Sequence, residues 1–148
     1  MEVQIEKAMV WRFLGDAEQV ARHMPGCQEV REVVPELEYE AVIEERLGPL
    51  KIRFDMKIAV LERRPEELIR IQAHGTDRKL GTSARGEMEV RLSEKAPNTT
   101  VIDIEANIQI TGKVASLGQV AIKRKAQDMV QQFTEELAAQ LQMKSEER

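Results

Sequence analysis

Residues 112–143 read GKVASLGQVAIKRKAQDMVQQFTEELAAQLQM, and this stretch has apolar residues at helical spacing after five runs with the alternation of β-strands. A helix of about 30 residues is roughly 45 Å long, which is enough to cross a whole β-sheet. A strongly twisted sheet cannot meet a straight rod along its full width. We therefore expect a gap between this helix and the sheet.

Small side chains stand at the inward positions of this helix and of the strands before it. On the helix, small residues lie between larger ones, namely Ala115, Gly118, Ala121 and Ala126 between Leu117, Met129, Phe133 and Leu137. On the strands, the small residues at inward positions are Ala41, Ala73, Ala84, Gly86 and Ala106. A sheet that touched its helix everywhere would need larger side chains there. The pattern predicts a container for an apolar small molecule.

Alternation of apolar and polar residues predicts the sheet. It is clearest in residues 51–61 and in residues 102–110, each of which has one apolar face. Further strands are expected at residues 3–5, 30–34, 37–47, 68–74 and 82–92, with the weakest pattern at 30–34. The short turns between these runs favour antiparallel neighbours.

Two short helices are expected between the first strand and the rest of the sheet. Residues 8–14 have helical spacing and stop at Gly15. Asp16 then stands where a helix N-cap belongs, with Gln19 three residues later as in a capping box. Pro25 cannot continue the second helix, which therefore ends just before it.

These elements predict one domain over residues 1–148 with an α+β fold. Its centre is a curved antiparallel sheet of six to seven strands wrapped around the long C-terminal helix, with the two short helices after the first strand. Residues 144–148 are strongly polar, so we expect a frayed tail there.

The composition excludes several classes of partner. The 148 residues include 22 basic and 26 acidic side chains that are interleaved, and the net charge of −4 disfavours a surface that follows nucleic-acid phosphates. Aromatic residues make up 3%, too few for a base-stacking platform. Cys27 is the sole cysteine, so we expect no internal disulfide and a reducing compartment. The sequence lacks a signal-peptide pattern and any run of 18 apolar residues, so we expect a soluble cytoplasmic protein.

Residue types that often carry catalysis or bind metals are few and scattered. His23 and His74 lie on separate predicted elements, and no spacing resembles a zinc site or a Cys–His pair. Cys27 is interpreted as a small buried side chain rather than a reactive thiol. The basic run at 123–125 spans much of the helix circumference, so we interpret it as a solvated face rather than a site for anionic headgroups. We expect no metal ion and no catalytic residue.

Glu45 and Tyr39 share the inward register of residues 37–47, and each has two interpretations. Glu45 is either an acid in the cavity or a strand-end carboxylate that reaches solvent, because an unpaired buried carboxylate is costly. Tyr39 either donates a hydrogen bond to a ligand oxygen or is a core tyrosine with its hydroxyl at the rim. An enzyme needs an acid and a base inside the cavity, and the inward positions offer only these two residues, Thr82 and Arg85.

Four short motifs occur in the order and at the spacing typical of one family. They are MPGC at 24–27, LGPL at 47–50, ARG at 84–86 and TGKVASLG at 111–118. With them the chain, over roughly residues 3–141, resembles the CoxG family, the G subunits of carbon monoxide dehydrogenase, within the START-like (SRPBCC), helix-grip superfamily. The resemblance implies a deep cavity between the sheet and the C-terminal helix. It also implies a role beside a membrane-associated molybdenum hydroxylase, attributed to membrane recruitment and to handling of a lipid-soluble quinone.

Pattern and resemblance together give one leading hypothesis, the non-enzymatic binding or carriage of a quinone or lipid-like molecule. The protein would support a molybdenum hydroxylase of the carbon monoxide dehydrogenase type, at the inner face of the membrane, with no cofactor other than a bound quinone or lipid. Two alternatives stay open, an enzyme of the polyketide cyclase or dehydratase kind and an assembly or membrane-recruitment factor. The residues expected to line the ligand site are Phe13, Met24, Tyr39, Ala41, Phe54, Met56, Ile58, Ile71, Ala73, Ala84, Met88, Ile104, Ala106, Ile108, Leu117, Ala121 and Met129.

Overall fold

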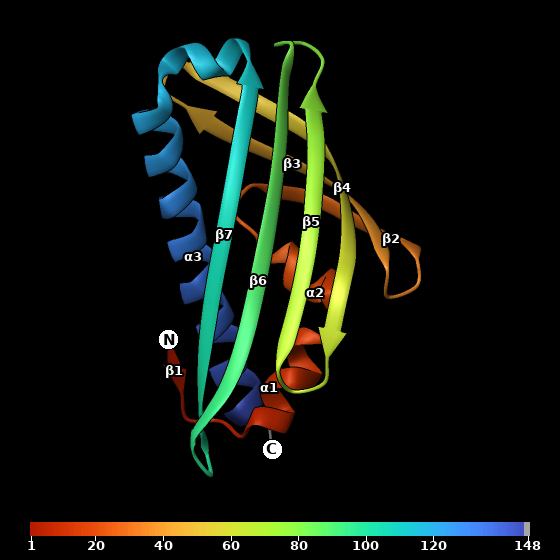
Figure 1. The fold of residues 1–148 in the computed structure, drawn as a ribbon, viewed down its shortest axis with the longest axis vertical. Coiled ribbons are helices and arrows are strands. Elements are labelled where there is room, and N and C mark those ends of the chain that lie inside the picture. Colours follow the sequence, from red (N-terminus) through yellow and green to blue (C-terminus); the bar gives the residue numbers. More distant parts are fainter. Residues whose placement is uncertain (147–148) are drawn as a thin grey trace.

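Seven antiparallel strands form one curved sheet in the order β1-β7-β6-β5-β4-β3-β2 (Figure 1). The computed structural model describes residues 1–146. The strands are β1 (Glu2–Val3), β2 (Cys27–Val34), β3 (Glu38–Leu47), β4 (Leu50–Arg64), β5 (Leu68–Asp77), β6 (Thr82–Ala96) and β7 (Thr99–Gly112). Strands β2 to β6 each pair with the next strand along the chain, which confirms the predicted α+β meander.

Several strands are longer than the apolar pattern predicted. Strands β4 and β6 have 15 residues each, and β7 has 14. The last residues of β6 are exposed, yet Glu94 still pairs with Thr100 across the hairpin. The apolar alternation ends where the strands leave the core, but the backbone hydrogen bonds between strands continue into solvent. The strands are therefore longer than the alternation predicted.

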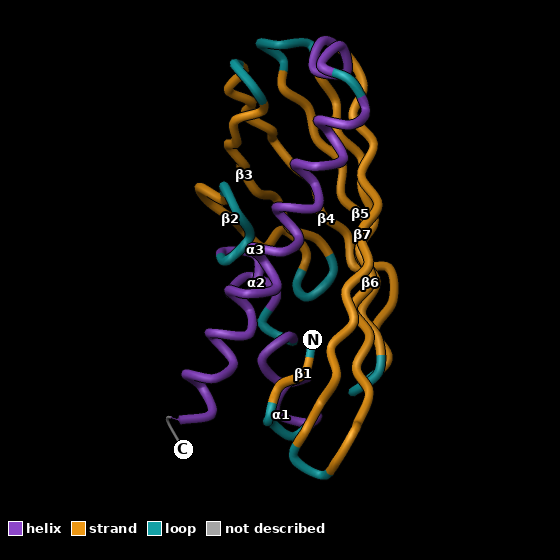
Figure 2. Tube along the Cα trace, turned by 90° about the vertical axis from the view of Figure 1, so that its left-hand side faces the viewer, coloured by secondary structure: helices purple, strands orange, loops and turns teal. Residues whose placement is uncertain are grey.

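The two short helices after β1 are α1 (Lys7–Leu14) and α2 (Ala17–Arg22), as predicted. Helix α1 buries Val10, Phe13 and Leu14 against the lower part of the sheet. The side chain of Asp16 caps α2 by accepting a hydrogen bond from the backbone N–H of Gln19 at 3.1 Å. Figure 2 shows both helices and the long helix on the concave side of the sheet.

The long helix differs from its prediction at both ends. It is split into a 3₁₀ segment, η1 (Lys113–Leu117), and the α-helix α3 (Gln119–Glu146). Gly118 between them has φ = 93°, a conformation that only glycine adopts readily and that breaks the helix. At the other end, α3 continues to Glu146, so residues 144–146 of the expected tail are helical in the structure. Residues 147–148 of the expected tail lie outside the described part.

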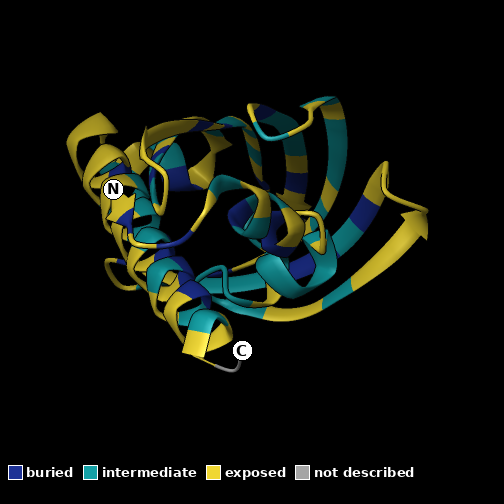
Figure 3. Ribbon diagram, turned by 90° about the horizontal axis from the view of Figure 1, so that it is seen from below, coloured by how far each residue is buried: buried dark blue, intermediate teal, exposed yellow. Residues whose placement is uncertain are grey.

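Two packed clusters hold α3 against the sheet, one near each end. The lower cluster joins α1, β1, β6 and β7 to the helix and consists of Val3, Ile5, Val10, Phe13, Leu14, Val90, Leu92, Ile102, Leu137 and Leu141. The upper cluster consists of Leu47, Ile52, Val114 and Ile122. Seen from below, the sheet curves around the short helices and α3 crosses its open side (Figure 3). The middle of α3 belongs to neither cluster.

Candidate ligand-binding site

A cavity of about 200 Å³ lies between the middle of the sheet and the middle of α3. Its walls come from β3 to β7, from α3 and from the turn after α2, which contributes Met24. The inward residues of α3 here are Ile122, Ala126, Met129 and Phe133, spaced by three or four residues along one helix face. The cavity therefore lies above the lower cluster and is bounded at its upper end by Leu47, Ile52 and Ile122 of the upper cluster.

Most residues predicted for the site line this cavity. They are Met24, Phe54, Met56, Ile58, Ile71, Ala73, Ala84, Met88, Ala106, Ile108 and Met129. Those on the strands come together because their positions follow the inward register of neighbouring, directly paired strands, such as Ile58 opposite Ala73 and Met88 opposite Ala106. Their convergence gives the sheet side of the cavity its apolar surface.

The other predicted residues lie elsewhere. Phe13 is buried in the lower cluster, Leu117 packs against the upper cluster, and Ala41 is buried opposite Met56 without reaching the cavity. Ala121 is exposed, whereas its neighbour Ile122, four residues before Ala126, is buried on the inward face of the helix. The remaining two, Tyr39 and Ile104, line adjoining hollows.

Tyr39 lines a small hollow of about 90 Å³ beside the cavity. Burial raises the pKa of the Tyr39 phenol above its ordinary value, and the neighbouring Glu32 carboxylate, to which the hydroxyl is hydrogen-bonded, raises this pKa further. Arg63 also interacts with the hydroxyl, by its charge and by a hydrogen bond, and lowers this pKa. The phenol therefore meets protein side chains at the rim, which agrees with the second of the two interpretations of Tyr39.

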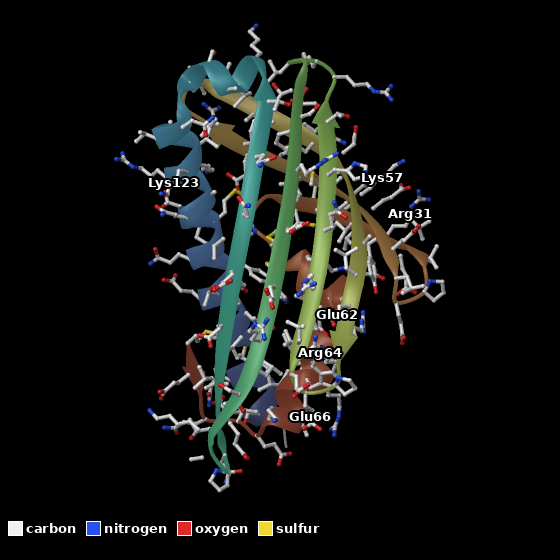
Figure 4. All side chains as sticks on the ribbon, viewed as in Figure 1. Arg31, Lys57, Glu62, Arg64, Glu66 and Lys123 are labelled. Atoms are coloured by element: carbon white, nitrogen blue, oxygen red, sulfur yellow. The ribbon has the colours of Figure 1, made fainter. Side chains whose placement is uncertain are left out.

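Glu45 faces the cavity and forms an ion pair with Lys125 of α3, with 2.8 Å between Oε2 and Nζ. The two side chains are only 23% and 32% exposed. The solvated interpretation of the basic run at 123–125 is thus wrong for Lys125, whereas Lys123 and Arg124 are exposed. Figure 4 shows Lys123 projecting outward from α3.

The turn after α2 closes the cavity near this ion pair. Gly26 has φ = 80°, and a Cβ atom there would overlap the carbonyl oxygen of Glu44 and crowd the side chain of Glu45. The backbone N–H of Glu44 donates a hydrogen bond to the carbonyl of Gly26 at 2.9 Å. Glycine at this position therefore lets the turn lie directly against β3, beside the carboxylate of Glu45.

Two further charged residues, Arg85 and Glu87, border the cavity on β6 on either side of Gly86. Both are exposed, and strand alternation directs their side chains to the opposite face of the sheet from Ala84 and Met88. Arg85 is therefore not the inward residue that the sequence suggested. Among the described residues, the charged side chains that face the cavity are those of Glu45 and Lys125.

An open groove of about 900 Å³ runs between α3 and the edge of β7. It shares Met88, Ala106, Ile108, Ile122, Ala126 and Val130 with the cavity, so the two spaces adjoin each other. Strand β1 pairs with β7 only at Thr100 and Val101, which leaves the edge above these residues open toward α3. The groove is more polar than the cavity, since Gln119, Gln127 and Gln131 of α3 line it.

Within residues 1–146, no group of three or more His, Cys, Asp or Glu side chains is arranged to hold a metal ion. The Nδ1 atom of His23 lies 3.5 Å from Oε1 of Glu136 on α3. The other histidine, His74, is on β5. Burial raises the pKa of the Cys27 thiol, which disfavours the reactive thiolate at neutral pH. No helix in the described part of the chain is long and apolar enough to cross a membrane.

A known family accounts for nearly the whole sequence. The model of the CoxG family, described as the G subunit of carbon monoxide dehydrogenase, matches residues 1–142. This chain belongs to the CoxG family. The match confirms the resemblance carried by the four motifs. No protein with a curated description matched the sequence.

Solved structures share the CoxG chain's fold at low sequence identity. A conserved protein from Geobacillus kaustophilus has a TM-score of 0.84 at 20% identity, covering 97% of this chain and 92% of that one. A START superfamily protein from Mycobacterium smegmatis has a TM-score of 0.69 at 11% identity, covering 97% and 94%. The ZhuI aromatase/cyclase from Streptomyces sp. R1128 has a TM-score of 0.67 at 10% identity, covering 96% and 90%. These likenesses confirm the START-like fold.

Proposed function

We propose that this protein binds and carries an apolar small molecule, quinone-like or lipid-like, in the cavity between the sheet and α3. The observation that carries the proposal is the cavity itself, which lies between the sheet and α3 and has almost entirely apolar walls. Such walls gain affinity from buried area, at about 25 cal/mol per Å², and need few polar contacts to orient a ligand. Met56, Met88 and Met129 supply flexible side chains that adapt to a guest.

The size of the spaces limits the shape of the ligand. A cavity of about 200 Å³ accepts a ring or a short chain, since a dry apolar cavity of about 150 Å³ is enough for benzene. Because the groove beside β7 adjoins the cavity, a longer molecule would place its compact end in the cavity and extend along α3 in the groove. A long molecule whose compact apolar end fits the cavity and whose remainder lies along α3 suits this arrangement.

The name of the family indicates a partner enzyme for this proposal. A CoxG protein would work beside a molybdenum hydroxylase of the carbon monoxide dehydrogenase type, and the carried molecule would serve that enzyme. Carriage and recruitment of the enzyme to a membrane are compatible. A pull-down with the enzyme's own polypeptides separates them. Binding of the enzyme that persists when the cavity is filled by Ala84→Phe and Ala106→Phe would favour recruitment over carriage.

Organic extraction of the purified protein, followed by mass spectrometry, tests the proposal. We expect an apolar compound that co-purifies with the wild type and is absent from the double variant Ala84→Phe/Ala106→Phe. The matched control is Ala96→Phe, at an exposed position near the end of β6. Extracts without any such compound, together with no binding of quinones or lipids in titrations, would contradict carriage.

An enzyme of the cyclase kind is the second candidate, favoured by Glu45 on the cavity wall. Its carboxylate is held by Lys125, and among the described residues no other side chain on the wall offers a second acid or base. Loss of turnover of an aromatic polyketide in Glu45→Gln, with binding intact, would place this candidate above carriage.

A further inference from the structure

The ion pair between Glu45 and Lys125 is the one charged feature on an otherwise apolar wall, as far as residues 1–146 show. It joins β3 to α3 on the side of the helix opposite the groove, whose lining includes neither residue. Lys125 is the member of the basic run 123–125 that turns toward the interior, and its side chain is two-thirds covered. A pair so placed lies within reach of any guest that fills the cavity.

We propose that this ion pair selects the ligand by charge, so that the cavity prefers an uncharged molecule with an oxygen acceptor, such as a ketone or an ester, over a carboxylate of the same length. The inference rests on the proposed function and names the chemistry of its ligand. The ammonium of Lys125 has three N–H donors, and Glu45 accepts at one oxygen, Oε2. The remaining donors are free to meet a carbonyl oxygen.

An anionic ligand would meet a different balance of charge. The ammonium of Lys125 is already neutralised by Glu45, so a second carboxylate would face a like charge in a half-buried place. It would also lose its hydration on entering the apolar cavity without a free counter-charge. A cationic ligand meets the same obstacle from Lys125. The neutral pair therefore disfavours both signs of charge while it keeps one hydrogen bond available for a neutral oxygen.

Calorimetric titration with three ten-carbon probes tests this preference, namely 2-decanone, decanoate and 1-decene at pH 7.5. The wild type is expected to bind 2-decanone about tenfold more tightly than decanoate. In Glu45→Gln, Lys125 has no counter-charge, so decanoate should gain at least tenfold and the preference should disappear. In Lys125→Met, 2-decanone should lose about fivefold, as for one hydrogen bond, while 1-decene is unchanged.

Arg124→Met is the matched control, since Arg124 is the exposed neighbour of Lys125 on the same helix and lines none of the spaces described above. It should leave all three affinities unchanged. Equal binding of decanoate and 2-decanone by the wild type, or an unaltered ratio in Glu45→Gln, overturns the inference while binding of 1-decene still supports carriage. If none of the three probes binds the wild type, the proposed function fails and the inference fails with it. The wild-type ratio alone decides the inference if a variant does not fold.

Discussion

The lower third of α3 and its middle differ although they belong to one helix over one sheet. In the lower third, Leu137 and Leu141 are 0% and 1% exposed and pack against α1 and the lower strands. In the middle, Ala126 and Met129 are only partly buried and face the cavity. The difference comes from what lies opposite. Helix α1 fills the concave side of the sheet at the lower end, whereas the middle of α3 lies across from the curved sheet and the turn after α2 (Figure 1).

The upper end of α3 is held in a third way, by polar contacts around η1 as well as by a small apolar cluster. The hydroxyl of buried Thr82 accepts a hydrogen bond from the backbone N–H of Val114 at 3.3 Å. Asp77 of β5 accepts hydrogen bonds from the backbone N–H groups of Arg53 and Leu80 at 2.9 and 3.0 Å, which fix the turn that leads into Thr82. The helix is thus fixed at both ends and spans the hollow between them, and this arrangement can be tested one region at a time.

Leu137→Ala should have the largest effect on stability, because it removes a fully buried side chain from the packed end. We expect the free energy of unfolding to fall by about 3 kcal/mol. Urea denaturation measures it, with Met129→Ala in the cavity as the comparison, for which we expect a loss of about 1 kcal/mol or less since Met129 already borders empty space. Equal losses at the two positions would contradict the difference in packing.

Gly112→Ala tests the upper end, where the chain leaves β7 for η1. Gly112 has φ = 98°, and a Cβ atom there would overlap the carbonyl oxygen of Gly81. We expect a loss of about 2 kcal/mol from clash and backbone strain together. The control is Gly81→Ala, at φ = 58° with open space around the Cβ position, which should show only the smaller backbone penalty of about 1 kcal/mol. A loss no greater than that of the control would show that the approach of the two turns is not needed.

The polar upper end should respond to pH. Burial alone would raise the pKa of Asp77, but the amide hydrogen bonds from Arg53 and Leu80 outweigh it and hold this pKa below its ordinary value. A carboxyl with a lowered pKa in the folded state stabilises the protein above the pKa of the unfolded state, and this contribution is lost as the pH falls through the folded value. Asp77→Asn should therefore be less stable than the wild type by about 1 kcal/mol at pH 7. Unfolding measured from pH 7 to pH 3 should show this difference shrinking, and a constant difference would contradict it.

Ala126→Leu should have the smallest effect, because the larger side chain projects into the cavity. We expect a change within about 0.5 kcal/mol, or a slight gain from the added apolar contact. The same substitution at Ala138, which packs against the lower cluster, should destabilise by about 1 to 3 kcal/mol through overpacking. Thermal melting of the two variants measures the contrast. A large loss in Ala126→Leu would mean that the middle of the helix has no room.

The strands and the fold class were predictable because strand alternation is a local property of the sequence. Residues 51–61 show their buried face without any knowledge of their neighbours. The break in the long helix was not predicted, since hydrophobic spacing does not report the backbone angles of a glycine. Gly112 and Gly118, six residues apart, were the available signal.

The strand side of the candidate site followed from the same register, and its helix side followed in part. Ala126, Met129 and Phe133 lie on the inward face as predicted, whereas Ala121 was wrongly placed inward and the inward side chain of Lys125 was missed. From the sequence, Lys125 was interpreted as one of three solvated basic residues. Its partner Glu45 lies 80 positions away, and only the tertiary fold brings the two together. Tracing the phase back from Phe133 through Met129 and Ile122 would have found the inward face.

Methyl NMR of the seven methionines during titration with 2-decanone is the sharpest test of a ligand space between the middle of α3 and the sheet. Met24, Met56, Met88 and Met129 line the cavity, whereas Met9 packs against the lower cluster and Met143 is exposed. If α3 stands away from the sheet in its middle and the space takes an apolar guest, the four cavity signals shift together to one saturation point while Met9 and Met143 stay fixed. Shifts confined to Met9 or Met143, or no shifts at all at saturating 2-decanone, would contradict a cavity under the middle of α3 that takes an apolar guest.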